Sequence, residues 1–201
     1  PLENKRGKII FGFEGIKDSL LQIALKTETP PSFKSFVNLE ESKDTLNYWY
    51  TPFETDSLQF RVTATNIDTL YTVNLRTSKT DSLLVRSITG NTLHPKDTFA
   101  IQTNIPIDRI DPNLIRIIDK DTLLVPFETI LDANKTKLSV YFNSKRNDKY
   151  RIDVLPETLV DFRGQTNDTL QFNLKTLDFE DYGMIEIQLK NTTQFPVLVD
   201  L

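Results

Sequence analysis

The sequence contains no cysteine and a single histidine, and each shortage removes a class of chemistry. Without cysteine there is no disulfide, no thiolate metal site and no cysteine nucleophile, although periplasm, cell surface and cytoplasm all stay open as compartments. Any catalytic triad or histidine-based acid–base site would have to use His94, which stands beside Pro95 in a polar stretch. A solvated linker histidine is the favoured interpretation, so we expect no catalytic residue.

Glycine and long apolar runs are also scarce. The 6 glycines are dispersed, so no phosphate-binding loop is present and nucleotide binding has no support. No apolar run is long enough to span a bilayer, and residues 1–4 do not resemble a signal peptide, so we expect an excised or processed segment. The formal net charge is -4, with basic residues scattered among acidic ones, which predicts no nucleic-acid partner and no general attraction to an anionic membrane.

One tripeptide is abundant: an aspartate, then serine or threonine, then a large apolar residue. Four consecutive copies lie 12, 12 and 13 residues apart, about the length of one short strand and one turn. Aspartate and serine or threonine hold turns by bonding nearby backbone groups, so the motif predicts where strands begin. Its copies begin at Asp18, Asp44, Asp56, Asp68, Asp81, Asp97, Asp121 and Asp168.

Hydrophobic periodicity predicts an all-β chain. Apolar and polar residues alternate over 58–63, 71–75, 138–142, 150–154 and 170–174, and short apolar runs occupy 8–13 and 20–25. No segment keeps helical spacing over three turns, although 110–113 could form one helical turn. Many short strands with regular turn signals favour antiparallel β-sandwiches.

Three units can be separated along the chain. We expect a β-sandwich domain over 1–88, a linker over 89–96 that opens a second sandwich domain over 89–177, and a β-hairpin over 178–201. That hairpin has too little apolar surface to be stable alone, so it packs on the second domain or begins a third.

The second unit combines the strand segments 99–101, 105–107, 115–119 and 150–155 with the turn Asp161-Phe162-Arg163-Gly164 before the last strand. In these segments it resembles a bacterial Ig-like module of surface-layer type. The whole succession, with 9–15, 48–58 and 182–185, is similar to flavobacterial (Bacteroidetes) Ig-like lipoproteins of unknown role. This resemblance implies a fold of tandem Ig-like antiparallel β-sandwiches. It also implies an extracytoplasmic protein, outer-membrane-anchored, periplasmic or on the cell surface, whose lipid anchor lies outside this chain. It implies no catalytic residue and no cofactor.

The last segment has two expected strands, 184–189 after Gly183 and 197–201 after Pro196. This pair resembles the first two strands of a transthyretin-like or carboxypeptidase-regulatory module. Such modules are structural sandwiches, which agrees with a third β domain.

Carboxylates are the remaining groups with chemical potential. Asp119 and Asp121, and the group Asp178, Glu180 and Asp181, are the densest, and the second stands where interdomain calcium would be useful. Neither matches a calcium loop, and no pair suited to glycoside hydrolysis is evident. Solvated turn acids are the favoured interpretation, and we expect no metal.

The best candidate for recognition is an aromatic stretch formed by Tyr48, Trp49, Tyr50 and Phe53. In a strand, Trp49 faces opposite to Tyr48 and Tyr50. If Trp49 is exposed, it offers a flat surface to sugar rings or to a protein partner. The favoured alternative is the buried tryptophan common in sandwiches.

The repeated tripeptide also resembles the acceptor sequence for protein O-glycosylation in Bacteroidetes, which modifies exported proteins. Thr98 departs from it because phenylalanine follows. The candidate acceptors are Ser19, Thr45, Ser57, Thr69, Ser82, Thr122 and Thr169.

Together these observations predict a non-enzymatic structural or interaction module of a cell-envelope lipoprotein, whose partner is a protein or a glycan of the envelope. The competing hypothesis is a carbohydrate-binding accessory domain that uses the aromatic surface around Trp49. Fold resemblance alone does not choose between them.

Overall fold

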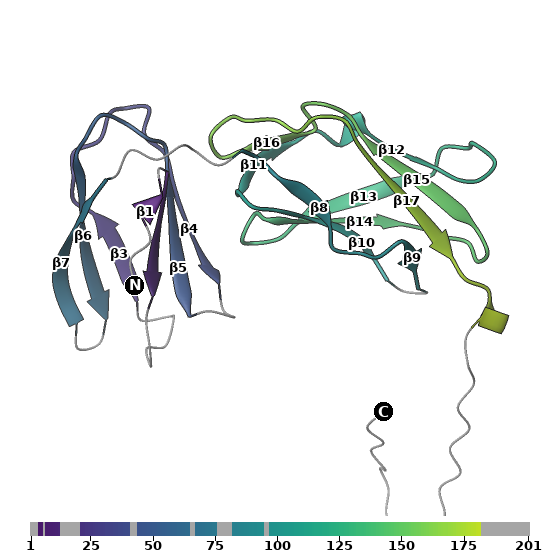
Figure 1. Cartoon of the computed structure of the whole chain (residues 1–201), viewed down its shortest axis with the longest axis horizontal. Helices are drawn as coiled ribbons and strands as arrows, with labels where there is room; N and C mark the ends of the chain where they lie inside the picture. The colour runs from purple at the N-terminus through teal and green to yellow at the C-terminus, as the bar shows by residue number, and fades with distance from the viewer. Residues whose placement is uncertain are drawn as a thin grey trace, which may run out of the picture.

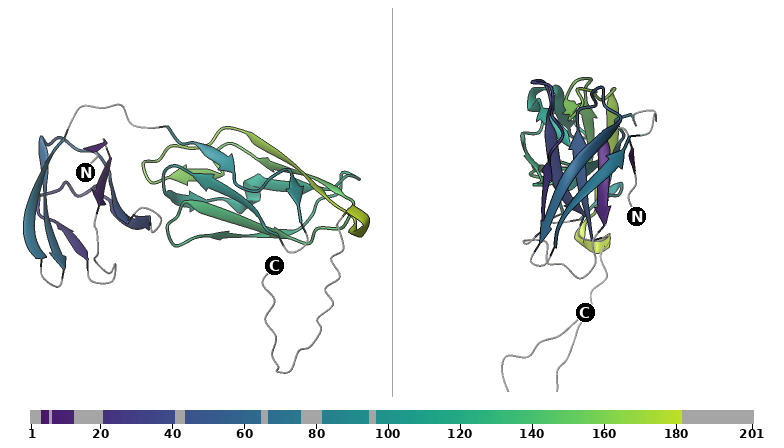
Figure 2. Two further views of the ribbon diagram at one scale, coloured as in Figure 1. Left: turned by 60° about the horizontal axis from the view of Figure 1, so that its bottom comes forward. Right: turned by 90° about the vertical axis from the view of Figure 1, so that its left-hand side faces the viewer.

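The structure is a computed structural model that describes residues 4–5, 7–12, 21–40, 44–64, 67–75, 82–94 and 97–181. These residues form two β-sandwiches that follow one another along the long axis of the molecule (Figure 1). In both figures the strands of the first sandwich run roughly across that axis, and those of the second run roughly along it (Figures 1 and 2).

The first sandwich packs a four-stranded sheet on a three-stranded one. The four-stranded sheet has the order β1 (Asn4–Lys5), β2 (Lys8–Gly12), β5 (Thr45–Tyr50), β4 (Ser35–Glu40). The three-stranded sheet has the order β3 (Gln22–Leu25), β6 (Ser57–Ala64), β7 (Ile67–Asn74), and every pairing in both sheets is antiparallel.

The second sandwich consists of two four-stranded sheets and a small two-stranded one. The first sheet has the order β13 (Phe127–Leu131), β14 (Lys137–Phe142), β10 (Phe99–Thr103), β8 (Val85–Ser87). The second has the order β12 (Ile115–Ile118), β15 (Lys149–Val154), β17 (Leu170–Thr176), β9 (Thr92–Leu93), in which β9 and β17 are parallel. β11 (Ile107–Ile110) pairs with β16 (Leu159–Asp161) at the end nearest the first sandwich (Figures 1 and 2).

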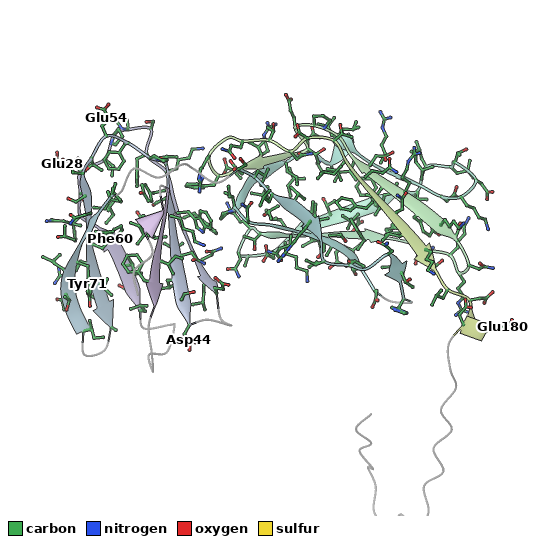
Figure 3. All side chains as sticks on the ribbon, in the orientation of Figure 1. Glu28, Asp44, Glu54, Phe60, Tyr71 and Glu180 are labelled. Atoms are coloured by element: carbon green, nitrogen blue, oxygen red, sulfur yellow. The ribbon has the colours of Figure 1, made fainter. Side chains whose placement is uncertain are left out.

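Each sandwich has its own hydrophobic core, built from alternate residues of its strands. In β6 the burial alternates as expected, with Leu58, Phe60 and Val62 buried between exposed neighbours. Figure 3 shows Phe60 inside the first sandwich, where its ring meets Tyr48 edge-on at 4.9 Å between centroids. The second core is built around Ile117, Ile152 and other fully buried aliphatic side chains. These two cores confirm the predicted fold class of tandem Ig-like antiparallel β-sandwiches.

The repeated tripeptide marks strand starts at most of its described copies. β5, β6, β7, β10 and β17 each begin within two residues of an aspartate of the repeat. The copy at Asp121 instead lies in the turn between β12 and β13, where Thr122 has a φ of 63°. The expected helical turn is also present, as the 3-10 helix η3 (Pro112–Leu114), which Asp111 caps by accepting a hydrogen bond from the Asn113 N–H.

The predicted boundary at residue 88 and the predicted linker over 89–96 are wrong. β8 pairs with β10, and β9 pairs with β17, so both belong to the second sandwich. Leu93 is buried, whereas Leu75 packs on the first core and Leu83 on the second, which puts the transition between Leu75 and Leu83. A two-residue strand is too short to show alternation, and for that reason the sequence resembled a linker.

The chain described after β17 ends in the 3-10 helix η4 (Phe179–Asp181), at the opposite end from the first sandwich (Figure 1). The hairpin expected over 178–201 lies almost wholly outside the described residues. The described residues contain no helix long and apolar enough to cross a membrane.

Candidate functional site

The aromatic side chains of β5 are buried on both faces of the strand, in two different hydrophobic clusters. Tyr48 and Tyr50 point into the first core, where they are 4% and 1% exposed. Trp49 points the other way, as strand geometry requires, yet it is only 3% exposed. A side chain on the outer face of a sheet is that deeply buried only when something else covers the face.

The second sandwich provides that cover. Trp49 forms a cluster with Ile105 and Phe162, which are 1% and 9% exposed, and Phe36 and Leu83 pack against its edge. We call this cluster the junction. Trp49 comes from the first sandwich and Ile105 and Phe162 from the second, so the junction forms a small third core between them. Its three buried residues belong to neither of the two sandwich cores.

A chain of two hydrogen bonds connects Trp49 to the second sandwich through Asn38. The Trp49 Nε1–H donates to Asn38 Oδ1 at 3.1 Å. The Asn38 Nδ2 in turn donates to the backbone oxygen of Asn134, in the second sandwich, at 3.2 Å. Asn38 therefore links the indole to the opposite domain, and its burial carries little cost because both its polar ends are bonded.

Cationic side chains cover the aromatic faces of the junction. Lys8 Nζ lies 4.6 Å from the centroid of the Trp49 ring, and the Arg163 guanidinium carbon lies 5.9 Å from it. Lys135 Nζ lies 5.1 Å from the Phe36 ring, so contacts of this kind cross from the second sandwich to both aromatic residues. At the rim, Lys34 Nζ and Asp108 Oδ2 form an exposed ion pair at 3.5 Å.

A tight turn after β16 brings Phe162 and Arg163 into contact with Trp49. The Asp161 Oδ1 accepts the backbone N–H groups of Arg163 and Gln165, both at 2.8 Å, which closes a tight turn after β16. This turn projects Phe162 and Arg163 toward the first sandwich. The resemblance to surface-layer modules singled out this Asp-x-x-Gly turn, and in this chain it contributes to the junction.

Gly7 leaves room for the Arg163 side chain against the first sandwich. Its φ is +85°, and a Cβ added there would lie 3.1 Å from Arg163 Nε and 3.2 Å from the backbone oxygen of Tyr50. Only glycine adopts this backbone conformation without strain while leaving room for the guanidinium.

The binding-site interpretation of the aromatic stretch needs correction. Tyr48, Trp49 and Tyr50 are buried, and Phe53 is half-buried against Phe33 on the first core, with 5.5 Å between ring centroids. These four residues therefore present no exposed platform to a sugar, and the condition on which the carbohydrate-binding alternative depended is not met. The interpretation of Trp49 as a buried tryptophan is right about burial but differs in place, because the indole lies between the sandwiches.

The candidate O-glycosylation residues fall into distinct environments. Thr69, Ser82, Thr122 and Thr169 are exposed, whereas Thr45 and Ser57 are half-buried, and Ser19 lies outside the described residues. The Thr45 hydroxyl oxygen is itself buried and has no hydrogen-bond partner in the described part of the chain. A glycosyltransferase can reach only the exposed acceptors, Thr69, Ser82, Thr122 and Thr169.

The acidic groups behave as turn residues. Asp119 Oδ1 accepts the backbone N–H groups of Asp121 and Leu123 at 3.0 and 2.9 Å, and Asp181 Oδ2 accepts that of Asp178 at 2.9 Å. No group of three or more potential metal ligands occurs among the residues that the structure describes. His94 is exposed at the end of β9.

Sequence reasoning missed most of the junction. Alternation around Trp49 showed that the indole faces away from Tyr48, but Asn38, Ile105 and Phe162 carry no signal that links them to it. The one available clue was the Asp161 turn, which marks a constrained loop without showing what the loop contacts.

No family model matches the sequence, and no curated protein matches it. Among solved structures, the chain is similar to the titin fragment Titin-A168169, with 11% identity and a TM-score of 0.30, over 88% of this chain and 96% of that one. It is also similar to domains 4-9 of the surface layer protein SbsC, with 9% identity and a TM-score of 0.30, over 85% of this chain and 29% of that one. Likeness at this level carries no functional argument, so the class of the protein, a tandem of Ig-like sandwiches, rests on its own strand pairing.

Proposed function

We propose that this chain is a non-enzymatic structural and interaction module of the cell envelope. Its two sandwiches act as one stiff unit that holds a binding surface at a set distance from an anchor outside the chain. The anchor would be a lipid on the outer membrane, and the partner a protein or glycan of the envelope. The observation that carries the proposal is the junction, because a cluster around a buried tryptophan holds the two domains together, whereas domains on a flexible tether would leave that tryptophan exposed.

The free-energy cost of exposing Trp49 supports a fixed orientation of the two sandwiches. Truncating a buried tryptophan costs about 3–5 kcal/mol, and the Trp49 side chain is buried only while the second sandwich covers it. Domains joined by a short linker normally move relative to one another unless the interface between them is apolar and well packed. The junction is apolar at its centre, and hydrogen bonds through Asn38 connect the Trp49 indole to the second sandwich, so it favours one relative orientation.

The experiment is a measurement of domain orientation in the full chain by residual dipolar couplings. We expect amide groups of both sandwiches to fit a single alignment tensor. Lys34→Ala is the matched control, since it removes only the exposed ion pair, worth at most about 1 kcal/mol, and should leave the tensor common to both sandwiches. Two independent tensors in the unaltered chain would show a flexible pair and remove the proposal.

O-glycosylation belongs to the same proposal, restricted to the exposed copies of the tripeptide. Thr69, Ser82, Thr122 and Thr169 are the acceptors we propose, and Thr45 serves as an internal comparison because its hydroxyl is buried. Peptide mass analysis of protein purified from its native host should find glycan on exposed copies and none on Thr45. Unmodified peptides throughout would remove this part of the proposal and leave the structural module standing.

A further inference from the structure

The outer face of the β12-β15-β17 sheet gathers cationic side chains from distant parts of the sequence. On this sheet Ile117, Ile152 and Leu174 point into the core, so their neighbours Arg151 and Lys175 point outward. The strand register places Arg151 between Ile118 of β12 and Asn173 of β17. Because the whole chain carries a net charge of -4, this concentration of positive charge is a product of the fold.

Two lysines of this face oppose each other directly. Lys149 of β15 is the cross-strand partner of Lys175 of β17. Like charges directly opposite in an antiparallel pair are destabilising, with Cβ atoms only about 5 Å apart. In the described part of the chain, neither Lys149 nor Lys175 has an acidic partner within ion-pair distance. A bound anion would relieve this repulsion.

A pocket of about 530 Å³ opens at the two lysines. Its lining contains four cations and one carboxylate, that of Asp119, whose Oδ1 accepts two backbone N–H groups. The remaining polar lining is amide and hydroxyl. The lining residues that carry the argument are Lys120, Lys149, Arg151, Lys175, Asn91 and Asn173.

The cations are not all equivalent. Arg151 Nε donates to Asp153 Oδ2 at 3.1 Å, which fixes the guanidinium in place and offsets part of its charge. Lys120, Lys149 and Lys175 have no such neighbour in the part of the chain that the structure describes. The three lysines therefore supply most of the field, and Arg151 supplies directed N–H donors.

We propose that this pocket binds an acidic saccharide, a sugar unit that carries a carboxylate, sulfate or phosphate. The anionic group would lie between Lys149 and Lys175, and the amides of Asn91 and Asn173 would bond hydroxyl groups beside it. Pockets of this size accept small ligands. The site gives the structural module a surface to present, and it does not involve the buried aromatic residues of β5.

The lining favours a sugar over a lipid surface. Docking on a membrane depends on apolar side chains that protrude into the interface. Of the apolar residues of this pocket, Tyr150 and Leu174 point into the core, and Ile118, which shares the outer face with Arg151, is half-buried. An open pocket lined by cations and amides instead matches a ligand that has both charge and hydroxyl groups.

The test is a titration of the full chain, followed by amide NMR shifts. The probes are a sulfated heparin-derived tetrasaccharide and a tetragalacturonate, with neutral maltotetraose and anionic phosphatidylglycerol vesicles as comparisons. We expect both acidic probes to shift signals of β12, β15 and β17 and to bind more weakly as salt is raised, and we expect maltotetraose and the vesicles to give no shift.

The decisive variant is Lys175→Glu, with Lys137→Glu as its matched control on the other sheet. Lys175→Glu should weaken binding of the acidic probes by about tenfold or more, since each charge-assisted contact contributes at least that factor. The same change should leave the melting temperature unchanged or raise it, because it replaces a like-charged cross-strand pair by an opposite one.

Lys137 lies exposed on β14, so its reversal should leave binding intact. Equal weakening by Lys175→Glu and Lys137→Glu would mean that only net charge matters and would overturn the site. The proposed site would also be overturned if neither acidic probe shifted the amide signals, or if only the vesicles did.

Discussion

Replacing Ile105 by aspartate should open the junction without unfolding either sandwich. Ile105 is 1% exposed and packs against Trp49, yet it belongs to neither sandwich core. Loss of a buried isoleucine side chain costs about 2–5 kcal/mol, and an unpaired buried carboxylate adds several more. The polar contacts that cross the junction contribute about 1 kcal/mol each, too little to keep it closed around a charge.

Trp49 is the only tryptophan in the chain, so its fluorescence reports on the junction alone. In Ile105→Asp we expect the emission to shift to longer wavelength and quenching by acrylamide to increase, while the far-ultraviolet circular dichroism of the strands is retained. Ile105→Val is the control, because it removes one methylene at a cost of about 1 kcal/mol and should leave the emission unchanged. Unchanged emission in a folded Ile105→Asp protein would refute burial of the indole by the second sandwich.

Further predictions concern single residues. Gly164→Ala should lower stability by about 1 kcal/mol, because Gly164 has a φ of +85° but its Cβ would meet no atom within 4 Å. Gly7→Ala should lower the free energy of unfolding by more, and should also expose Trp49 to quencher, since its Cβ would press on Arg163 and on the Tyr50 carbonyl. Chemical denaturation compares the unfolding free energies of the two variants, and equal losses would contradict the close packing at Gly7. Burial raises the pKa of Tyr48, an effect only partly offset by a hydrogen bond with the Ser35 side chain. Its stabilising contribution is therefore full below the unfolded pKa of about 10 and is lost as the pH rises through the folded pKa. Tyr48→Phe should flatten the alkaline decline in unfolding free energy, and an identical decline in the variant would show that Tyr48 is not its source.

Local structure was largely predictable because it depends on short-range physics. Alternation in 58–63 and 150–154 predicted the buried rows of β6 and β15, and the Asp-Ser/Thr-apolar repeat predicted most of the strand starts that the structure describes. Periodicity failed at β9, where two residues cannot show a pattern, so that segment resembled a linker. The domain boundary was misplaced because β8, a strand of three residues, was counted with the first sandwich although it pairs with β10.

By itself the sequence determined an all-β chain of short strands, the two faces of each longer strand, and the absence of cysteine chemistry. Tertiary structure alone decided what covers each face: the outer face of β5 meets the second sandwich at Trp49, and the outer face of β15 brings Lys149 opposite Lys175. The physical reason is that a period of two fixes which residues share a face, whereas the neighbour of that face comes from residues far away in the chain. Lysines that are scattered among acids along the sequence therefore become one cationic pocket only when the sheet is assembled.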